Sequence, residues 1–236
     1  MSNRQTPLEP NYDRLGELAV HSVWKTIQGE GPLTGTPAIF VRVYGCNLKC
    51  PSCDTDYTST KMLYNPESLL KKIQGIQNKP CLVVLTGGEP LIQNVVPFIS
   101  LLLQRDYHVQ IETNGTFCPP AFFTAPTPGL SIVCSPKMGY VNIPQNLITA
   151  WKYIIEAGHV DAEDGLPTRV LGMNSKPFRP GGRVQDPQVK TAPIYVQPQD
   201  DMDEEKNKAN TLEAVRSCMQ FGYILSTQIH KIVGVE

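Results

Sequence analysis

The sequence predicts an α/β fold, an incomplete parallel (β/α) barrel, and three observations lead to it. Short apolar runs alternate with helical segments along most of the 236 residues, which favours parallel strands joined by right-handed crossovers. The run Cys81–Thr86 is almost continuously apolar, as expected of a strand buried on both faces. The interval Gly158–Thr191 is rich in Gly, Pro and polar residues and predicts no amphipathic helix. A barrel of such units would therefore be incomplete.

The elements are predicted in order from Glu17 onward. Asn65 is a suitable N-cap and Pro66 a suitable first residue for a helix through Gln77. Two further helices are expected, over Asn94–Arg105 and over Asp203–Gly222. The predicted strands are Glu17–Thr26, Pro37–Gly45, Cys81–Thr86, His108–Thr113, Leu130–Ser135, Trp151–Ala157, Pro193–Gln199 and Tyr223–Ile232.

Composition limits the classes of function. The formal net charge of −1 argues against a nucleic-acid partner, and no apolar run is long enough to span a membrane. The N-terminus lacks the apolar core of a secretory signal, so a cytoplasmic protein with reduced thiols is expected. We expect a flexible segment over residues 1–16 and one domain over residues 17–236. Seven cysteines in that setting indicate metal binding or catalysis.

Three of these cysteines, Cys46, Cys50 and Cys53, stand in the stretch YGCNLKCPSCD with the spacing C-x3-C-x2-C. Burial as small hydrophobes explains them poorly, because their loop is polar. A structural zinc site normally needs four ligands; His21 or Cys118 could supply the fourth through folding, but nothing in the sequence indicates it. An iron–sulfur cluster with three thiolates would keep one iron free for a ligand. The triplet therefore favours a reactive metal centre.

Two further motifs follow later strands. TGGEP, Thr86–Pro90, comes directly after an apolar strand, where glycines allow the backbone to approach a ligand closely. SPK, Ser135–Lys137, follows another predicted strand. Because the carboxyl ends of parallel strands meet at one edge, we expect these motifs and the cysteines to share a site.

The triplet and these motifs resemble the radical S-adenosylmethionine superfamily. The resemblance implies a [4Fe–4S] cluster on Cys46, Cys50 and Cys53, whose open iron binds S-adenosylmethionine. Further segments resemble the 7-carboxy-7-deazaguanine synthase family: TIQGEGPLTGTPAIFVR, CDT, IETNGT, QP and TQIHK, in matching order between Thr26 and Lys231. This implies a lyase that removes hydrogen from C6 of 6-carboxy-5,6,7,8-tetrahydropterin, contracts the ring and releases ammonia. The product is 7-carboxy-7-deazaguanine, a queuosine precursor.

The resemblance also implies roles for particular residues. The cofactor-binding set is Ser52, Cys53, Asp54, Gly87, Gly88, Glu89, Ser135, Lys137 and Gln197. The substrate-binding set is Ile27, Gln28, Gly29, Glu30, Arg42, Thr86, Glu112 and His230. Arg42 could clamp the substrate carboxylate with two N–H groups. Thr55 matches the family's Mg²⁺ position. A homodimer and a reductase such as flavodoxin are the implied partners.

The sequence departs from the family pattern in two places and leaves two alternative functions open. Ser52 stands where the family commonly has an aromatic residue, so only its backbone is expected to contact the cofactor. The interval Gly158–Thr191 has little match to the family. An activase that installs a glycyl radical on a partner protein shares the cysteine triplet, and a zinc-binding module without catalysis is the alternative from another class. The pterin-facing residues argue against the first, and GGEP and SPK against the second.

Overall fold

One sheet of nine strands organises the computed structural model, which describes residues 3–13, 16–180 and 192–235. The strand order is β3-β1-β2-β4-β5-β6-β7-β8-β9. The strands are β1 Leu18–Ile27, β2 Pro37–Val43, β3 Met62–Tyr64, β4 Leu82–Gly87, β5 His108–Thr113, β6 Leu130–Cys134, β7 Ala150–Ile155, β8 Ile194–Pro198 and β9 Ile224–Leu225. The helices are α1 Pro66–Ile76, α2 Val96–Gln104, α3 Glu204–Phe221 and α4 Ile229–Ile232, with 3₁₀ turns η1 Gly31–Leu33, η2 Pro90–Ile92 and η3 Gln145–Leu147.

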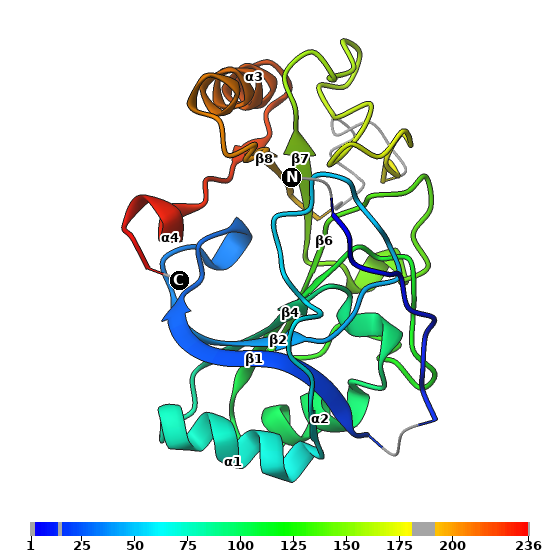
Figure 1. Cartoon of the computed structure of the whole chain (residues 1–236), viewed down its shortest axis with the longest axis vertical. Coiled ribbons are helices and arrows are strands. Elements are labelled where there is room, and N and C mark those ends of the chain that lie inside the picture. Colours follow the sequence, from blue (N-terminus) through cyan, green and yellow to red (C-terminus); the bar gives the residue numbers. More distant parts are fainter. Residues whose placement is uncertain (1–2, 14–15, 181–191, 236) are drawn as a thin grey trace.

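The sheet forms an open arc. Strand β2 and all strands from β4 to β9 run parallel, whereas β1 is antiparallel to both β2 and β3. Strands β3 and β9 are the two free edges of the described sheet, and Figure 1 shows the strands curving between them. The predicted incomplete parallel barrel is therefore confirmed, and the antiparallel N-terminal hairpin adds to it.

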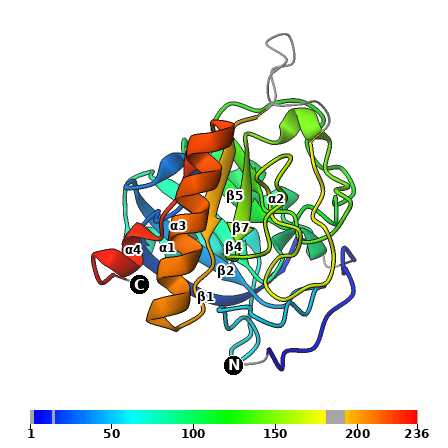
Figure 2. The same cartoon turned by 90° about the horizontal axis from the view of Figure 1, so that it is seen from above.

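The helices cover the outside of this arc. Helices α1 and α2 pack against each other and against β1 and β5, while α3 packs along β7, β8 and β9, as Figures 1 and 2 show. Between helices and sheet lies a continuous core whose members include Ile39, Leu85, Phe98 and Tyr153, all fully buried. Burial of these apolar side chains is the main force that fixes the strands.

Local sequence signals explain where the helices begin and end. The Asn65 side chain accepts a hydrogen bond from Ser68 N at 2.8 Å, and Asp203 does the same for Lys206 N at 3.0 Å. Each satisfies a backbone donor that has no partner within the helix. Gly222, with a φ of 76°, ends α3 in the left-handed conformation that glycine adopts without steric cost.

The predicted strand Tyr223–Ile232 is wrong over most of its length. Strand β9 comprises two residues, and its ladder ends where Ser226 N donates to Val196 O. Ile229 N then donates to Gly29 O, and residues Ile229–Ile232 form α4. The apolar pattern is genuine, but the chain leaves the sheet to make these contacts with the loop after β1.

No helix occurs in residues 158–180, which agrees with the prediction for Gly158–Thr191 over this part; residues 181–191 lie outside the described residues. As far as the structure describes them, the connections after β5, β6 and β7 contain no α-helix, only the short turn η3 between β6 and β7. No helix in the described ranges is long and apolar enough to cross a membrane.

Candidate functional site

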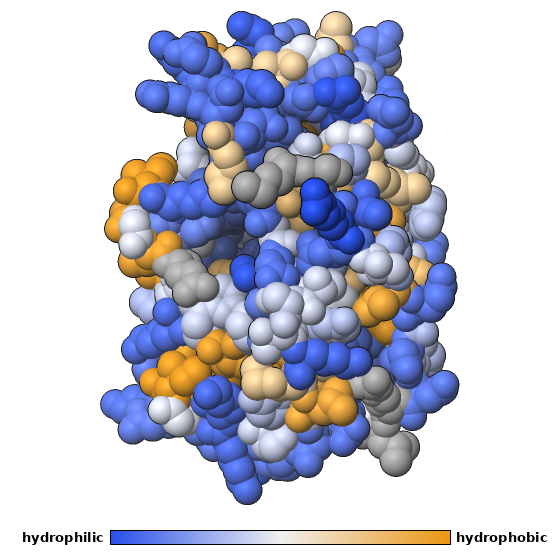
Figure 3. All heavy atoms as spheres, viewed as in Figure 1, coloured by the Kyte–Doolittle hydropathy of each residue, from blue (hydrophilic) through white to orange (hydrophobic). Residues whose placement is uncertain are grey.

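A cavity of about 510 Å³ lies at the carboxyl ends of the parallel strands. Figure 3 shows it as a hollow with a largely hydrophilic rim. Thr86 lies one residue before the end of β4, Thr113 ends β5, Ser135 follows β6 and Gln197 lies near the end of β8. This edge of an open parallel sheet is where α/β proteins commonly bind ligands.

Most residues predicted for the site line this one cavity. They are Cys46, Cys50, Ser52, Cys53, Asp54, Thr55, Gly87, Gly88, Ser135, Lys137, Gln197, Ile27, Gln28, Glu30, Arg42, Thr86, Glu112 and His230. Gly29 and Glu89 are buried and do not line the cavity. Residues that are far apart in sequence therefore meet in one place, although the individual binding roles predicted for them stay predictions.

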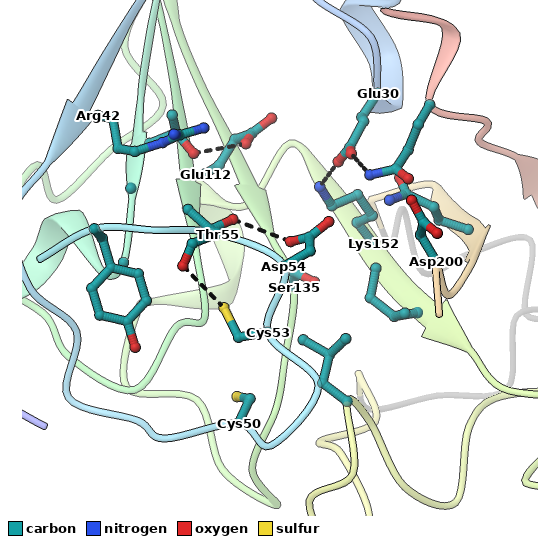
Figure 4. Close-up of a pocket in the computed structure, with 18 of the residues that line it drawn as sticks. Glu30, Arg42, Cys50, Cys53, Asp54, Thr55, Glu112, Ser135, Lys152 and Asp200 are labelled. Atoms are coloured by element: carbon teal, nitrogen blue, oxygen red, sulfur yellow. Dashed lines mark hydrogen bonds and ion pairs between the residues drawn. The ribbon is translucent and has the colours of Figure 1, made fainter. Parts of the chain in front are cut away.

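The three cysteines are free thiols that face the cavity, and Cys50 and Cys53 lie side by side in Figure 4. Burial raises the pKa of each thiol above its usual value. Thiolates are the ligands that iron–sulfur clusters take, so three free cysteines lining one cavity are a donor set that fits such a cluster.

The glycines at the end of β4, Gly87 and Gly88, allow close packing behind the cysteines. A Cβ atom on Gly88 would lie 2.1 Å from Gly45 O, and one on Gly87 would lie 2.6 Å from Val43 O. Gly87 also has a φ of 145°, which side chains rarely permit. Any larger residue would push the turn away from Cys46, so the GG pair sets the depth of the cavity.

Glu89 connects the turn after β4 to the end of β5. Its carboxylate is fully buried and accepts hydrogen bonds from Thr113 Oγ1 at 2.7 Å, Asn114 N at 2.7 Å and Leu91 N at 2.9 Å. Burial raises the pKa of this carboxyl. These bonds fix the turn after β4 to the end of β5, so any contact between Glu89 and a cofactor stays a prediction.

Lys137 brings a cation to the floor of the cavity. Its Nζ donates to Ser135 O at 2.8 Å and Ser135 Oγ at 2.6 Å. Burial lowers the pKa of Lys137, while the nearby Cys50 thiol opposes that shift. The SPK motif therefore presents a positive group close to the three cysteines.

A carboxylate network forms the opposite wall. Glu112 accepts hydrogen bonds from Gln28 Nε2 at 3.0 Å, Thr86 Oγ1 at 3.0 Å and Gln110 Nε2 at 3.3 Å. Arg42 lies nearby in β2, with its guanidinium 4.8 Å from the centre of the Trp24 ring. Figure 4 shows Arg42 and Glu112 together on this side. The wall thus offers one guanidinium and one carboxylate side by side.

Sequence reasoning missed Lys152. This lysine of β7 forms an ion pair with Glu30, which also accepts a hydrogen bond from Gln228 Nε2 at 2.8 Å. Burial would raise the pKa of Glu30, but Lys152 lowers it to about 2. His230 packs on Gly29, where a Cβ would lie 1.8 Å from its Nδ1, and burial lowers the pKa of His230.

The helix-free segment after β7 also reaches the site. Ser52 N donates to Leu171 O at 3.0 Å, and Leu171 lines the cavity. A Cβ on Gly172, whose φ is 75°, would lie 3.1 Å from Pro51. The segment therefore walls the cysteine loop, a contact for which the sequence carries no short-range signal.

Comparisons with known proteins agree with this geometry. The model of the Radical SAM superfamily matches residues 40–122. The 7-carboxy-7-deazaguanine synthase of Rhodospirillum rubrum is 43% identical over 229 residues, which is 92% of each chain. That of Rickettsia prowazekii is 35% identical and covers 93% of this chain and 89% of its own.

The fold is also shared with a solved structure. QueE from Escherichia coli superposes with a TM-score of 0.64, covering 90% of this chain and 94% of its own at 24% identity. That likeness supports the architecture, and the sequence identity to the bacterial relatives carries the family. The chain therefore belongs to the 7-carboxy-7-deazaguanine synthase family of radical S-adenosylmethionine enzymes.

Proposed function

We propose that the cavity converts 6-carboxy-5,6,7,8-tetrahydropterin into 7-carboxy-7-deazaguanine with loss of ammonia. The observation that carries the proposal is the meeting of three free thiols, the GG turn and the Arg42–Glu112 wall in one cavity. A cluster on Cys46, Cys50 and Cys53, together with S-adenosylmethionine, would supply abstraction of the hydrogen at C6. The protein itself has to bind the substrate, orient C6 and exclude water.

The substrate carries one carboxylate and a guanidine-like edge. Arg42 is suited to the carboxylate because a guanidinium can donate two parallel N–H bonds. Glu112 is suited to ring N–H groups, since Gln28 and Thr86 hold its two oxygens toward the cavity. Glu30, kept ionised by Lys152, is the second acceptor. Two acceptors and one cation match the polarity of a carboxylated pterin.

The remaining residues support the cofactors. Lys137, Ser135, Gly87, Gly88 and the backbone near Ser52 lie on the cysteine side of the cavity, which is suited to S-adenosylmethionine. Thr55 is the candidate Mg²⁺ ligand; its Oγ1 donates to Asp54 Oδ1 at 3.1 Å. A single protein hydroxyl with substrate oxygens and water is an arrangement that Mg²⁺ accepts.

The test uses anaerobically reconstituted protein with reductant, S-adenosylmethionine, Mg²⁺ and the carboxypterin, and detects the deazapurine by mass spectrometry. Product from wild type, and none from Cys50→Ala, is the expected result. Cleavage of S-adenosylmethionine without deazapurine would reject the substrate and favour a glycyl-radical activase. A colourless protein that takes up only zinc would reject the enzyme.

The cellular setting belongs to the same proposal. We expect a single catalytic domain over residues 17–236, a homodimer, a cytoplasmic location and a flavodoxin-like electron donor, as the family resemblance implies. Seven free cysteines among the residues of the structure are consistent with a reducing compartment. Light scattering during size-exclusion chromatography measures the oligomeric state directly, and a monomer of 26.1 kDa would reject the dimer.

A further inference from the structure

We propose that the N-terminal segment 3–12, here called the strap, positions the cysteine loop, residues 44–58, for cluster binding. This inference rests on the proposed role of the three cysteines as cluster ligands. Figure 1 shows the dark blue strap running beside the cyan loop that follows β2. The strap contributes no cysteine, so it acts only through the loop.

The strap binds the backbone at two of the three cysteines. Leu8 N donates to Cys46 O at 2.8 Å, and Asn3 Nδ2 donates to Cys50 O at 3.2 Å. Asn3 N also donates to Pro51 O at 3.0 Å. Asn3 is buried, with 8% of its surface exposed. Removing a donor from such a site leaves a carbonyl without its partner, which costs more than an exposed bond.

Gln5 clamps the other end of the loop. Its Nε2 donates to Thr55 O at 2.9 Å, and its Oε1 accepts from Tyr57 N at 2.9 Å and Thr58 Oγ1 at 3.0 Å. Asn3 Oδ1 accepts from both Gln5 N at 2.9 Å and Gln5 Nε2 at 3.2 Å. The two strap side chains therefore form one connected unit that spans the loop from Cys50 to Thr58.

The strap is itself anchored to the barrel. Asn11 N donates to Ile92 O at 2.8 Å, and Tyr12 Oη donates to Leu91 O at 2.8 Å. Leu8 packs onto Gly45, where a Cβ would lie 2.4 Å from Leu8 Cδ1. Gly45 has a φ of 88°, so glycine is required there for conformation as well as space.

The loop needs such support because between β2 and β3 it contains no helix or strand. Three ligands must keep fixed separations for a cluster to stay bound, and preorganised ligands bind metals with less entropic cost. The strap supplies hydrogen bonds that a sheet or helix would otherwise supply. Asn3 and Gln5 are therefore positioning residues, not ligands.

The experiment compares Asn3→Ala and Gln5→Ala with Asn11→Ala as the matched control. Asn11 lies in the same strap and is exposed, and among the described residues its side chain accepts one hydrogen bond, from Asp13 N at 3.2 Å. Each protein is reconstituted anaerobically, and loss of the cluster's visible absorbance is followed after adding an iron chelator. We expect cluster loss at least about tenfold faster in both test variants, because each loses several side-chain hydrogen bonds of about 1 kcal/mol each, and a wild-type rate in Asn11→Ala.

A second readout separates positioning from general stability. In the apoprotein, thiol labelling should speed up at Cys46, Cys50 and Cys53 but not at Cys218, a half-buried thiol on α3. If labelling of Cys218 speeds up equally, or if cluster loss in the test variants is no faster than in Asn11→Ala, the inference is overturned. Should Gln5→Ala fail to fold, Gln5→Glu keeps the acceptor and removes only the Nε2 donor, which bonds Thr55 O and Asn3 Oδ1. Wild type that takes up no iron would overturn the cluster assignment itself.

Discussion

At the scale of single residues, Arg42 offers the sharpest test of substrate recognition. Arg42→Lys keeps the positive charge but removes the planar pair of N–H donors that a carboxylate accepts. We expect KM for the carboxypterin to rise about tenfold or more, a loss of at least ~1.4 kcal/mol, while iron content stays at the wild-type level. Steady-state kinetics on reconstituted enzyme measure this.

Arg105→Lys is the control for that substitution, because Arg105 is exposed at the end of α2, outside the cavity. An unchanged KM in Arg42→Lys would reject the carboxylate clamp. A fall in kcat alone, with KM unchanged, would instead indicate that Arg42 acts after the substrate has bound.

Lys152 gives a stability prediction. Lys152→Met removes the cation from a buried pair and leaves the Glu30 carboxylate with the Gln228 amide. We expect the free energy of unfolding in urea at neutral pH to fall by about 3 kcal/mol. The double variant Glu30→Gln, Lys152→Met should recover much of this loss. A loss below about 1 kcal/mol in the single variant would show that water solvates the Glu30 carboxylate in place of Lys152.

Lys152 also shows which contacts the sequence does not predict at this scale. A charged residue inside an apolar strand signals a buried partner. Arg42 in β2 and Lys152 in the run AWKYII both carry this signal, but the family resemblance pointed only to Arg42. The partner of Lys152, Glu30, lies 122 residues away, and only the barrel's curvature brings η1 beside β7. Residue types at strand ends were predictable, whereas pairings across the cavity were not.

At the scale of elements, the sequence predicts helix ends correctly where neighbouring residues determine them. Helix α1 begins after Asn65 and α3 ends at Gly222, as their sequences predict. The strand predicted over Tyr223–Ile232 failed because an edge strand and a helical turn share the same apolar pattern, and tertiary contacts to Gly29 decide between them. The contact between Leu171 and the cysteine loop was not predicted for the same reason, because it depends on tertiary structure.

The C-terminal turn α4 leads to a prediction about pH. Lys231 donates to Asp200 at 2.6 Å, and that bond, with bonds from Met202 N and Asn207, lowers the pKa of Asp200 to about 2. The unfolded carboxyl has the higher pKa, so this stabilisation is present above about pH 4 and is lost as pH falls toward 2.

Asp200→Asn should therefore lose up to about 1 kcal/mol at pH 6, as for partly exposed pairs, and the difference from wild type should shrink on acidification. Urea unfolding of the apoprotein between pH 6 and pH 3 measures it. A difference that is independent of pH would assign the effect to packing and not to charge.

At the scale of the whole molecule, ligand binding and folding are one equilibrium. The cavity is walled by residues from Trp24 in β1 to Val235 after α4, so any bound cofactor links strands from both halves of the arc. A ligand that binds only the folded state adds RT ln(1 + [L]/Kd), about 2.7 kcal/mol at a hundredfold excess over Kd. S-adenosylmethionine should therefore raise the melting temperature of the reconstituted protein by about 5 °C or more.

The size of that rise tests whether the cluster anchors the cofactor. If the open iron binds S-adenosylmethionine, treatment with an iron chelator should abolish most of the shift, and Cys50→Ala should show little shift from the start. Anaerobic differential scanning fluorimetry with and without cofactor measures all three samples. An equal shift in chelated protein would mean that Lys137, Ser135 and the GG turn hold the cofactor unaided. The three thiols would then hold the cluster only for electron transfer, and the residues at the strand ends would determine the affinity for S-adenosylmethionine.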